Sequence, residues 1–164
     1  MVPELSIRQF QDCDASAAAN LFFEAVQTGA KAAYTQEQRN VWAPAIPDVA
    51  TWRDRLAAQY SVMAYQGGEL LGFMTLTEEG VIDLAFVHPK AMGSGVAGKL
   101  YDVIMKEART RPLTTLQTRA SHLARRFFEK RDWSVVQQQT AVRGDVELIN
   151  FRMELKMKSE DTTA

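Results

Sequence analysis

VIDLAFVHPKAMGSGVAGKLY, residues 81–101, is the stretch that decides the fold of this chain. Its first seven residues include one charge and end shortly before Pro89, a pattern that predicts a buried strand. Three glycines within six residues predict a loop, and apolar residues then recur at helical spacing from Val96. Glycine lets the backbone turn tightly and present several N–H groups, and the start of the helix adds partial positive charge. The stretch therefore predicts an anion cradle for a ligand that carries phosphates.

Length and composition favour one domain without disulfides. The chain has 164 residues, a formal net charge of -1 and one cysteine, Cys13. This charge balance gives no electrostatic footprint for nucleic acids, and a single cysteine excludes an internal disulfide and a zinc-type cysteine cluster. No apolar run approaches the roughly 20 residues that span a bilayer. We expect one domain over residues 1–158, a disordered tail over 159–164, and a cytoplasmic protein without membrane or nucleic-acid partners.

The order of the expected elements defines the fold class. Strands are expected over residues 5–10, 61–65, 70–76, 81–87, 114–119, 135–143 and 146–156. Helices are expected from Asp12 or Asp14 to Gly29, from a Thr35 capping box to Pro44, and over 51–60, 96–111 and 122–130. Glycines between strands predict hairpins. The sequence therefore predicts an α/β fold in which helices flank a mixed, mostly antiparallel sheet of six to seven strands.

Two motifs in this chain resemble those of a known family. Residues 87–100, with Gly95 and Ala97, are similar to the acetyl-coenzyme A signature of the GNAT acetyltransferase superfamily, although Met92 stands where Arg or Gln is usual. Residues 124–133, ARRFFEKRDW, resemble the family's second landmark, which commonly reads Phe-Tyr-Glu-Lys-x-Gly-Phe. The order of elements also fits from Leu5 to about Lys156.

The resemblance implies an N-acetyltransferase that uses acetyl-coenzyme A (acetyl-CoA) as cosubstrate, without a metal. In this family the cofactor strand carries a bulge that frees backbone groups for the pantetheine arm and the thioester oxygen. The cofactor-binding residues implied here are Phe86, Val87, Met92, Gly93, Ser94, Gly95, Val96, Ala97, Gly98, Ser121 and Phe128. Phe128 stands where a tyrosine often protonates the leaving thiolate, so that role is vacant or has moved.

Asp83 and Tyr34 are the candidate catalytic residues. Asp83 is the one charge within residues 81–87, and an ionised carboxylate in a buried strand needs a partner. It is a candidate base or amine anchor, or else it is held by an arginine or a backbone N–H. Tyr34 lies between the first two helices, where the resemblance places the acceptor pocket. It could supply the missing hydroxyl or pack as an ordinary aromatic residue.

Other interpretations of the same residues stay open. GSGVAGK, residues 93–99, fits the first seven positions of a phosphate-binding P-loop, but Leu100 replaces the Ser or Thr that binds magnesium. A coenzyme A binding module without catalysis is the other alternative. The basic residues of segment 125–131 are interpreted as the solvent-exposed face of one helix. The acceptor is expected to be a small-molecule amine or a peptide, and the edge of the C-terminal hairpin could pair two copies into a homodimer.

Overall fold

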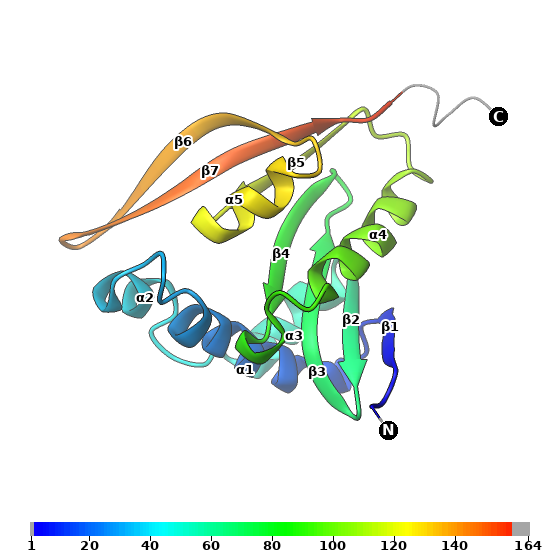
Figure 1. Cartoon of the computed structure of the whole chain (residues 1–164), viewed down its shortest axis with the longest axis horizontal. Helices are drawn as coiled ribbons and strands as arrows, with labels where there is room; N and C mark the ends of the chain where they lie inside the picture. Colours follow the sequence, from blue (N-terminus) through cyan, green and yellow to red (C-terminus); the bar gives the residue numbers. More distant parts are fainter. Residues whose placement is uncertain (1, 159–164) are drawn as a thin grey trace.

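The computed structural model describes residues 2–158 and shows one seven-stranded sheet with helices on both faces (Figure 1). The strands are β1 (Leu5–Gln9), β2 (Tyr60–Gln66), β3 (Glu69–Leu76), β4 (Val81–Val87), β5 (Thr115–Ala120), β6 (Ser134–Arg143) and β7 (Val146–Lys156). Their order in the sheet is β1-β2-β3-β4-β5-β7-β6. Only the β4–β5 pair is parallel. The predicted mixed, mostly antiparallel sheet is therefore confirmed.

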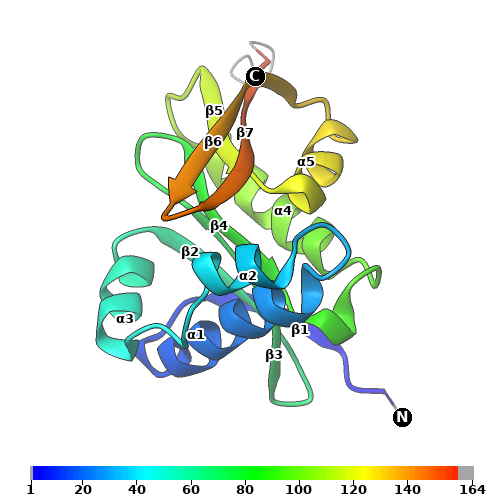
Figure 2. The same cartoon turned by 90° about the vertical axis from the view of Figure 1, so that its left-hand side faces the viewer.

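The sheet separates the hydrophobic core into two clusters, and a layer of helices covers each of them. The helical elements are η1 (Asp12–Asp14), α1 (Ala15–Glu24), η2 (Ala25–Gly29), α2 (Gln36–Trp42), α3 (Val49–Ala57), η3 (Pro89–Ala91), α4 (Val96–Ala108) and α5 (His122–Glu129). Helices α4 and α5 pack on one face of the sheet, where Leu100, Ile104 and Phe128 are fully buried. Helices α1 and α3 cover the other face of the N-terminal strands. Figure 2 shows α2 between α1 and the β6–β7 hairpin.

Strands β4 and β5 separate soon after they pair. Their ladder contains Val81 with Gln117 and Ile82 with Thr118. Beyond Ile82 the two strands diverge, as Figure 1 shows. A one-residue bulge in β4 accompanies the separation, because the β3 pairing steps by two residues while the β4 pairing steps by three. The edge of β4 that faces β5 therefore carries unpaired backbone groups from Asp83 onward.

Helix α1 is anchored to the sheet by one buried carboxylate. Asp14 is 1% exposed and accepts two bonds of 2.8 Å from the Arg8 guanidinium and one of 2.5 Å from the Tyr65 hydroxyl. It also accepts from the Gln11 N–H at 2.8 Å. Burial by itself would raise the pKa of Asp14, but these hydrogen bonds hold that pKa below its ordinary value. Asp14 thus fixes the start of α1 rather than capping it with its side chain.

Most expected elements are present, with some differences at their ends. The capping box is confirmed, since Thr35 and Gln38 bond each other's backbone N–H at 3.1 and 2.9 Å. Helix α1 is shorter than predicted: it changes at Ala25 into the π-helical turn η2. Helix α4 ends at Ala108, earlier than the Pro112 signal indicates. None of the helices within residues 2–158 has the length and apolarity to cross a membrane. The predicted tail, 159–164, lies outside the described residues.

Candidate active site

A cavity of about 580 Å³ lies where β4 separates from β5. Its lining comes from β3, the end of β4 and the loop after it, the start of α4, α5 and the turn that follows it, and the segment from α1 to α2. We call one part the loop end, lined by Gly93, Gly95, Val96, Ala97, Gly98, Lys130 and Arg131. We call the other the aromatic end, lined by Ala25, Gly29, Ala30, Trp42, Phe73 and Phe86. One cavity therefore joins a glycine loop to an aromatic pocket.

The glycine loop is shaped to present backbone rather than side chains. Gly93 has φ of 77° and Gly95 has φ of 91°, in the left-handed region that favours glycine. A Cβ at either position would meet nothing within 4 Å, so the backbone there can be approached closely. Gly95 caps α4, whose first N–H groups have no acceptor within the helix. These N–H groups and the helix dipole are the features that the predicted anion cradle requires.

Ten of the eleven residues named from the sequence as cofactor-binding line this cavity. They are Phe86, Val87, Met92, Gly93, Gly95, Val96, Ala97, Gly98, Ser121 and Phe128. Ser94 is the exception, because its hydroxyl turns back to donate to the Ala91 carbonyl. The contiguous segment from β4 to the start of α4 thus forms one wall of the cavity, as the sequence predicts.

The β4 bulge puts an unpaired backbone edge beside the glycine loop. The Leu84 N–H, displaced from the strand ladder, donates instead to the Thr75 hydroxyl at 3.0 Å. Ala85, Phe86 and Val87 follow and line the cavity. Because the His88 N–H donates to the Leu71 carbonyl on β3, the alternation of the ladder turns the backbone groups of Phe86 toward β3 and leaves those of Ala85 and Val87 available to a ligand on the side that β5 has left.

Ser121 brings a hydroxyl to the cavity at the start of α5. It is the N-cap of that helix, and its hydroxyl accepts from the Ala124 N–H at 3.2 Å. Tyr34 lies behind it, 5% exposed, where its hydroxyl accepts from the His122 N–H at 3.0 Å and donates to the Ile149 carbonyl at 3.3 Å. Burial raises the pKa of Tyr34, and hydrogen bonds from His122 and Ser121 oppose the rise. Tyr34 does not itself line the cavity.

Arg131 is a cavity residue that the sequence interpretation missed. Its guanidinium lies 3.7 Å from the centre of the Phe127 ring and donates to the Phe127 carbonyl at 3.1 Å. A Cβ on Gly98 would lie 2.9 Å from Arg131 Nη2, so glycine is what lets the guanidinium approach the first turn of α4. The interpretation of this basic segment as a solvent-exposed face is therefore wrong for Arg131, which stacks on Phe127, whereas Lys130 is exposed as predicted and also borders the loop end.

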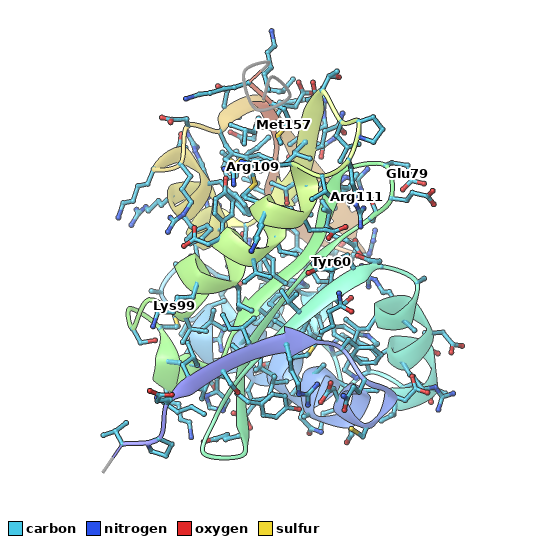
Figure 3. All side chains as sticks on the ribbon, turned by 90° about the vertical axis from the view of Figure 1, so that its right-hand side faces the viewer. Tyr60, Glu79, Lys99, Arg109, Arg111 and Met157 are labelled. Carbon is cyan, nitrogen blue, oxygen red and sulfur yellow. The ribbon has the colours of Figure 1, made fainter. Side chains whose placement is uncertain are left out.

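Lys99, the P-loop lysine of the alternative interpretation, does not line the cavity. It is exposed and lies on the outward side of α4 near its beginning (Figure 3). A P-loop lysine has to reach the phosphates that its loop holds. The geometry of Lys99 does not provide that contact.

Asp83 lies at the β4 bulge, on the side of α3. It accepts two bonds of 3.0 Å from Arg55 and one of 2.7 Å from Gln59. Burial alone would raise the pKa of Asp83, but the hydrogen bonds from Arg55 and Gln59 and the charge of Arg55 keep it below its ordinary value. Asp83 is absent from the cavity lining. The structure thus shows the arginine partner that the sequence left as one option.

Comparisons with known proteins place this geometry in a family. A family model described as an acetyltransferase (GNAT) domain matches residues 30–155. The chain belongs to the GNAT acetyltransferase family. The predicted family, fold and enzyme class are therefore confirmed, and with them the P-loop alternative is set aside. No curated protein sequence matches this chain.

Solved structures agree with this assignment. A GCN5-related N-acetyltransferase from Rhodopseudomonas palustris is 30% identical, with a TM-score of 0.86 over 96% of this chain and 99% of that one. PaiA N-acetyltransferase from Thermoplasma acidophilum, solved with coenzyme A, is 14% identical, with a TM-score of 0.76 over 94% and 99% of the two chains. YncA from Salmonella typhimurium, solved with acetyl-CoA, is 17% identical, with a TM-score of 0.76 over 95% of each chain. The last two show the fold alone.

Proposed function

We propose that this GNAT acetyltransferase moves the acetyl group of acetyl-CoA to the amine of a small molecule by direct attack. The observation that carries the proposal is the single cavity that joins the glycine loop, the unpaired edge of β4 and the start of α5. Two GNAT structures of the same fold, from Thermoplasma acidophilum and Salmonella typhimurium, hold coenzyme A or acetyl-CoA. The transfer proposed here needs no metal ion.

The loop end fits the phosphates of the cosubstrate. Gly93 and Gly95 leave their backbone open, and the first N–H groups of α4 would hold the pyrophosphate. Met92 removes the charge that the family motif usually has, but the cradle is made of backbone N–H groups and does not need it. Arg131 supports the fit by bringing one positive charge to the same end.

The edge of β4 fits the reacting part of the cosubstrate. Acetyl-CoA, when bound, supplies the acetyl group as a thioester. Backbone groups of Ala85 and Val87, which face the side that β5 has left, would orient the pantetheine arm and stabilise the negative charge that develops on the carbonyl oxygen. The amine nitrogen then forms a bond to the acetyl carbon and loses one proton, while the carbon–sulfur bond breaks and the sulfur gains one proton.

We assign the proton for the sulfur to the Ser121–Tyr34 pair. Phe128 lines the cavity but has no hydroxyl, and Ser121 carries the one hydroxyl among the described lining residues. Tyr34 lies directly behind Ser121, because its hydroxyl accepts from the N–H of the next residue, His122, at 3.0 Å, and we propose that a proton passes from this phenol through Ser121 to the cavity. Asp83 stays a proposal as general base, although a carboxylate with a lowered pKa is a weak one.

Acetyl-CoA binding and thiol release test the proposed function together. We expect acetyl-CoA to raise the melting temperature, magnesium-ATP to leave it unchanged, and a panel of amines to release coenzyme A faster than water does. Tyr34→Phe should lower kcat about tenfold without changing the Kd of acetyl-CoA, as removal of a proton donor does. Tyr60→Phe is the matched control, because Tyr60 lies on β2 outside the cavity lining. No release with any amine, despite binding, would favour the coenzyme A binding module suggested by Phe128.

Two further expectations stay predictions. A reducing cytoplasm suits the exposed thiol of Cys13, and cell fractionation tests that location. The β6 edge carries the exposed residues Val136 and Val142, 46% and 57% accessible, which supports the expected homodimer. Sedimentation of the purified protein tests dimerisation.

A further inference from the structure

Among the described residues, the aromatic end of the cavity has no charged side chain. Its described lining is three small residues of the α1–α2 segment and three aromatic rings, Trp42, Phe73 and Phe86. Trp42 and Phe86 have ring centres 6.3 Å apart at 54°, and Phe73 and Phe86 have ring centres 5.8 Å apart at 44°. Trp42 and Phe86 are partly exposed and leave flat apolar surface beside the small residues, whereas Phe73 is fully buried. The shape suits a flat apolar group better than a flexible chain of polar atoms.

Trp42 is held firmly enough to act as a wall of this end. It is the last residue of α2, and its ring packs edge-on against Tyr34 with ring centres 5.3 Å apart. Buried Arg39, on the same helix, donates to the Gln27 carbonyl at 2.5 Å and to the Tyr34 carbonyl at 3.3 Å. Gln27 in turn donates to the Ala43 carbonyl at 2.8 Å. These bonds tie α2 to η2, so the pocket is formed before a ligand enters.

No carboxylate lines the cavity anywhere along the described residues. Glu24, near this end on α1, pairs with His88 at 3.0 Å, and Asp83 pairs with Arg55 on the side of α3. A second ammonium group of a diamine, buried here, would therefore have no anionic partner, which is strongly unfavourable. The lining thus selects against acceptors that bring extra positive charge into the pocket.

We propose that the acceptor of this enzyme is a primary amine attached to an aromatic or similarly flat apolar group, and that diamines and polyamines are poor acceptors. The inference rests on the proposed acetyl transfer and adds the substrate class. The ring of the acceptor packs against Trp42 and Phe86, and its neutral amine lies beside the unpaired edge of β4.

Matched amines test the proposal with the full-length protein. Phenethylamine and tryptamine are compared with cadaverine and spermidine in the thiol-release assay. We expect kcat/KM to be at least about tenfold higher for the aromatic amines, the discrimination that one well-packed apolar group gives. Trp42→Ala should raise the KM for phenethylamine about tenfold, and Trp42→Phe should restore most of the loss. Ile46→Ala, which shortens an exposed side chain just beyond α2, should change nothing.

Each outcome separates this inference from the proposed function. The Kd of acetyl-CoA is measured for every variant, and an unchanged value shows that a loss is not one of folding. Equal or faster acetylation of the diamines, or no effect of Trp42→Ala, would overturn the substrate class and leave acetyl transfer standing. A selective loss of diamine activity in Asp83→Asn would overturn it too, because it would show an anionic anchor in use. Acetyl-CoA binding without turnover of any amine would overturn both.

Discussion

The loop end of the cavity is built from one contiguous segment and mainly from backbone, whereas the aromatic end is built from side chains of separate elements. Gly93–Gly98 supply most of the loop end, and the positive φ angles of two glycines set its form. Trp42, Phe73 and Phe86 come from α2, β3 and β4, and they meet only after the fold has formed. A backbone cradle can serve one cosubstrate across a family, while a side-chain pocket can change with the acceptor.

The largest effect is expected from a substitution that disrupts only the loop end. Gly95→Val forces a β-branched residue to a φ of 91° and places its side chain in the open cradle. We expect the Kd of acetyl-CoA, measured by calorimetry, to rise about 30-fold, a loss of about 2 kcal/mol. Gly144→Val is the matched control, because Gly144 has a φ of 61° in the β6–β7 turn, far along the chain from the loop. Equal weakening in both variants would mean that strain, not cradle geometry, is responsible.

The next effect concerns the anchorage of α1. This helix continues into η2, which supplies small residues to the aromatic end. Asp14→Asn removes the charge that Arg8 and Tyr65 share, and we expect the free energy of unfolding at neutral pH to fall by about 2 kcal/mol. The pKa of Asp14 is lowered in the folded chain, so its contribution is full above the unfolded pKa and is lost as pH falls through the folded pKa. Urea unfolding should show the gap between wild type and variant narrowing below about pH 4. A gap that stays constant at acid pH would contradict this role.

A smaller effect tests whether a side chain supports the backbone cradle. Arg131→Gln should weaken acetyl-CoA binding about tenfold, because a charge-assisted bond to a phosphate is lost. Arg126→Gln is the control, since Arg126 is exposed on α5, just before the turn that holds Arg131, and does not line the cavity. The KM for the amine should be unaffected by either change. If both variants bind acetyl-CoA like wild type, the loop end is purely a backbone site.

The smallest expected effect concerns Asp83, which lies on the side of α3 and belongs to neither end of the cavity. Its pairing with exposed Arg55 and its lowered pKa predict that Asp83→Asn changes kcat less than about threefold while it lowers the melting temperature slightly. The change in kcat is measured with saturating acetyl-CoA. A tenfold or larger fall in kcat at unchanged melting temperature would instead establish the catalytic role proposed from the sequence.

The two ends also differ in how far the sequence predicts them. The strand, the glycine loop and α4 are predictable because apolar periodicity, glycine spacing and a proline act on neighbouring residues. Those local signals gave the fold class and nearly the whole loop end. Tyr34 was proposed for its hydroxyl, and the fold places that hydroxyl behind Ser121 rather than in the cavity.

Residues that depend on tertiary packing were not predictable in the same way. Trp42 follows the helical spacing of a core residue, and only the packing of α2 beside β7 turns it toward the cavity. Arg131 has the same sequence signal as its exposed neighbours, because its stacking on Phe127 and its approach to Gly98 join two helices. No local sequence pattern in residues 25–29 predicts the π-helical turn η2. Contacts between residues far apart in the chain leave no periodic pattern in the sequence from which they could be predicted.

The most direct test of whether this cavity binds acetyl-CoA follows the backbone amide signals of Gly93–Gly98 during an acetyl-CoA titration. Proton–nitrogen correlation spectra of the labelled protein report each N–H separately. We expect the largest shifts on these amides and on Val87, with no comparable shifts on addition of magnesium-ATP. Shifts centred elsewhere, or the same response to magnesium-ATP, would contradict the assignment of this cavity to acetyl-CoA.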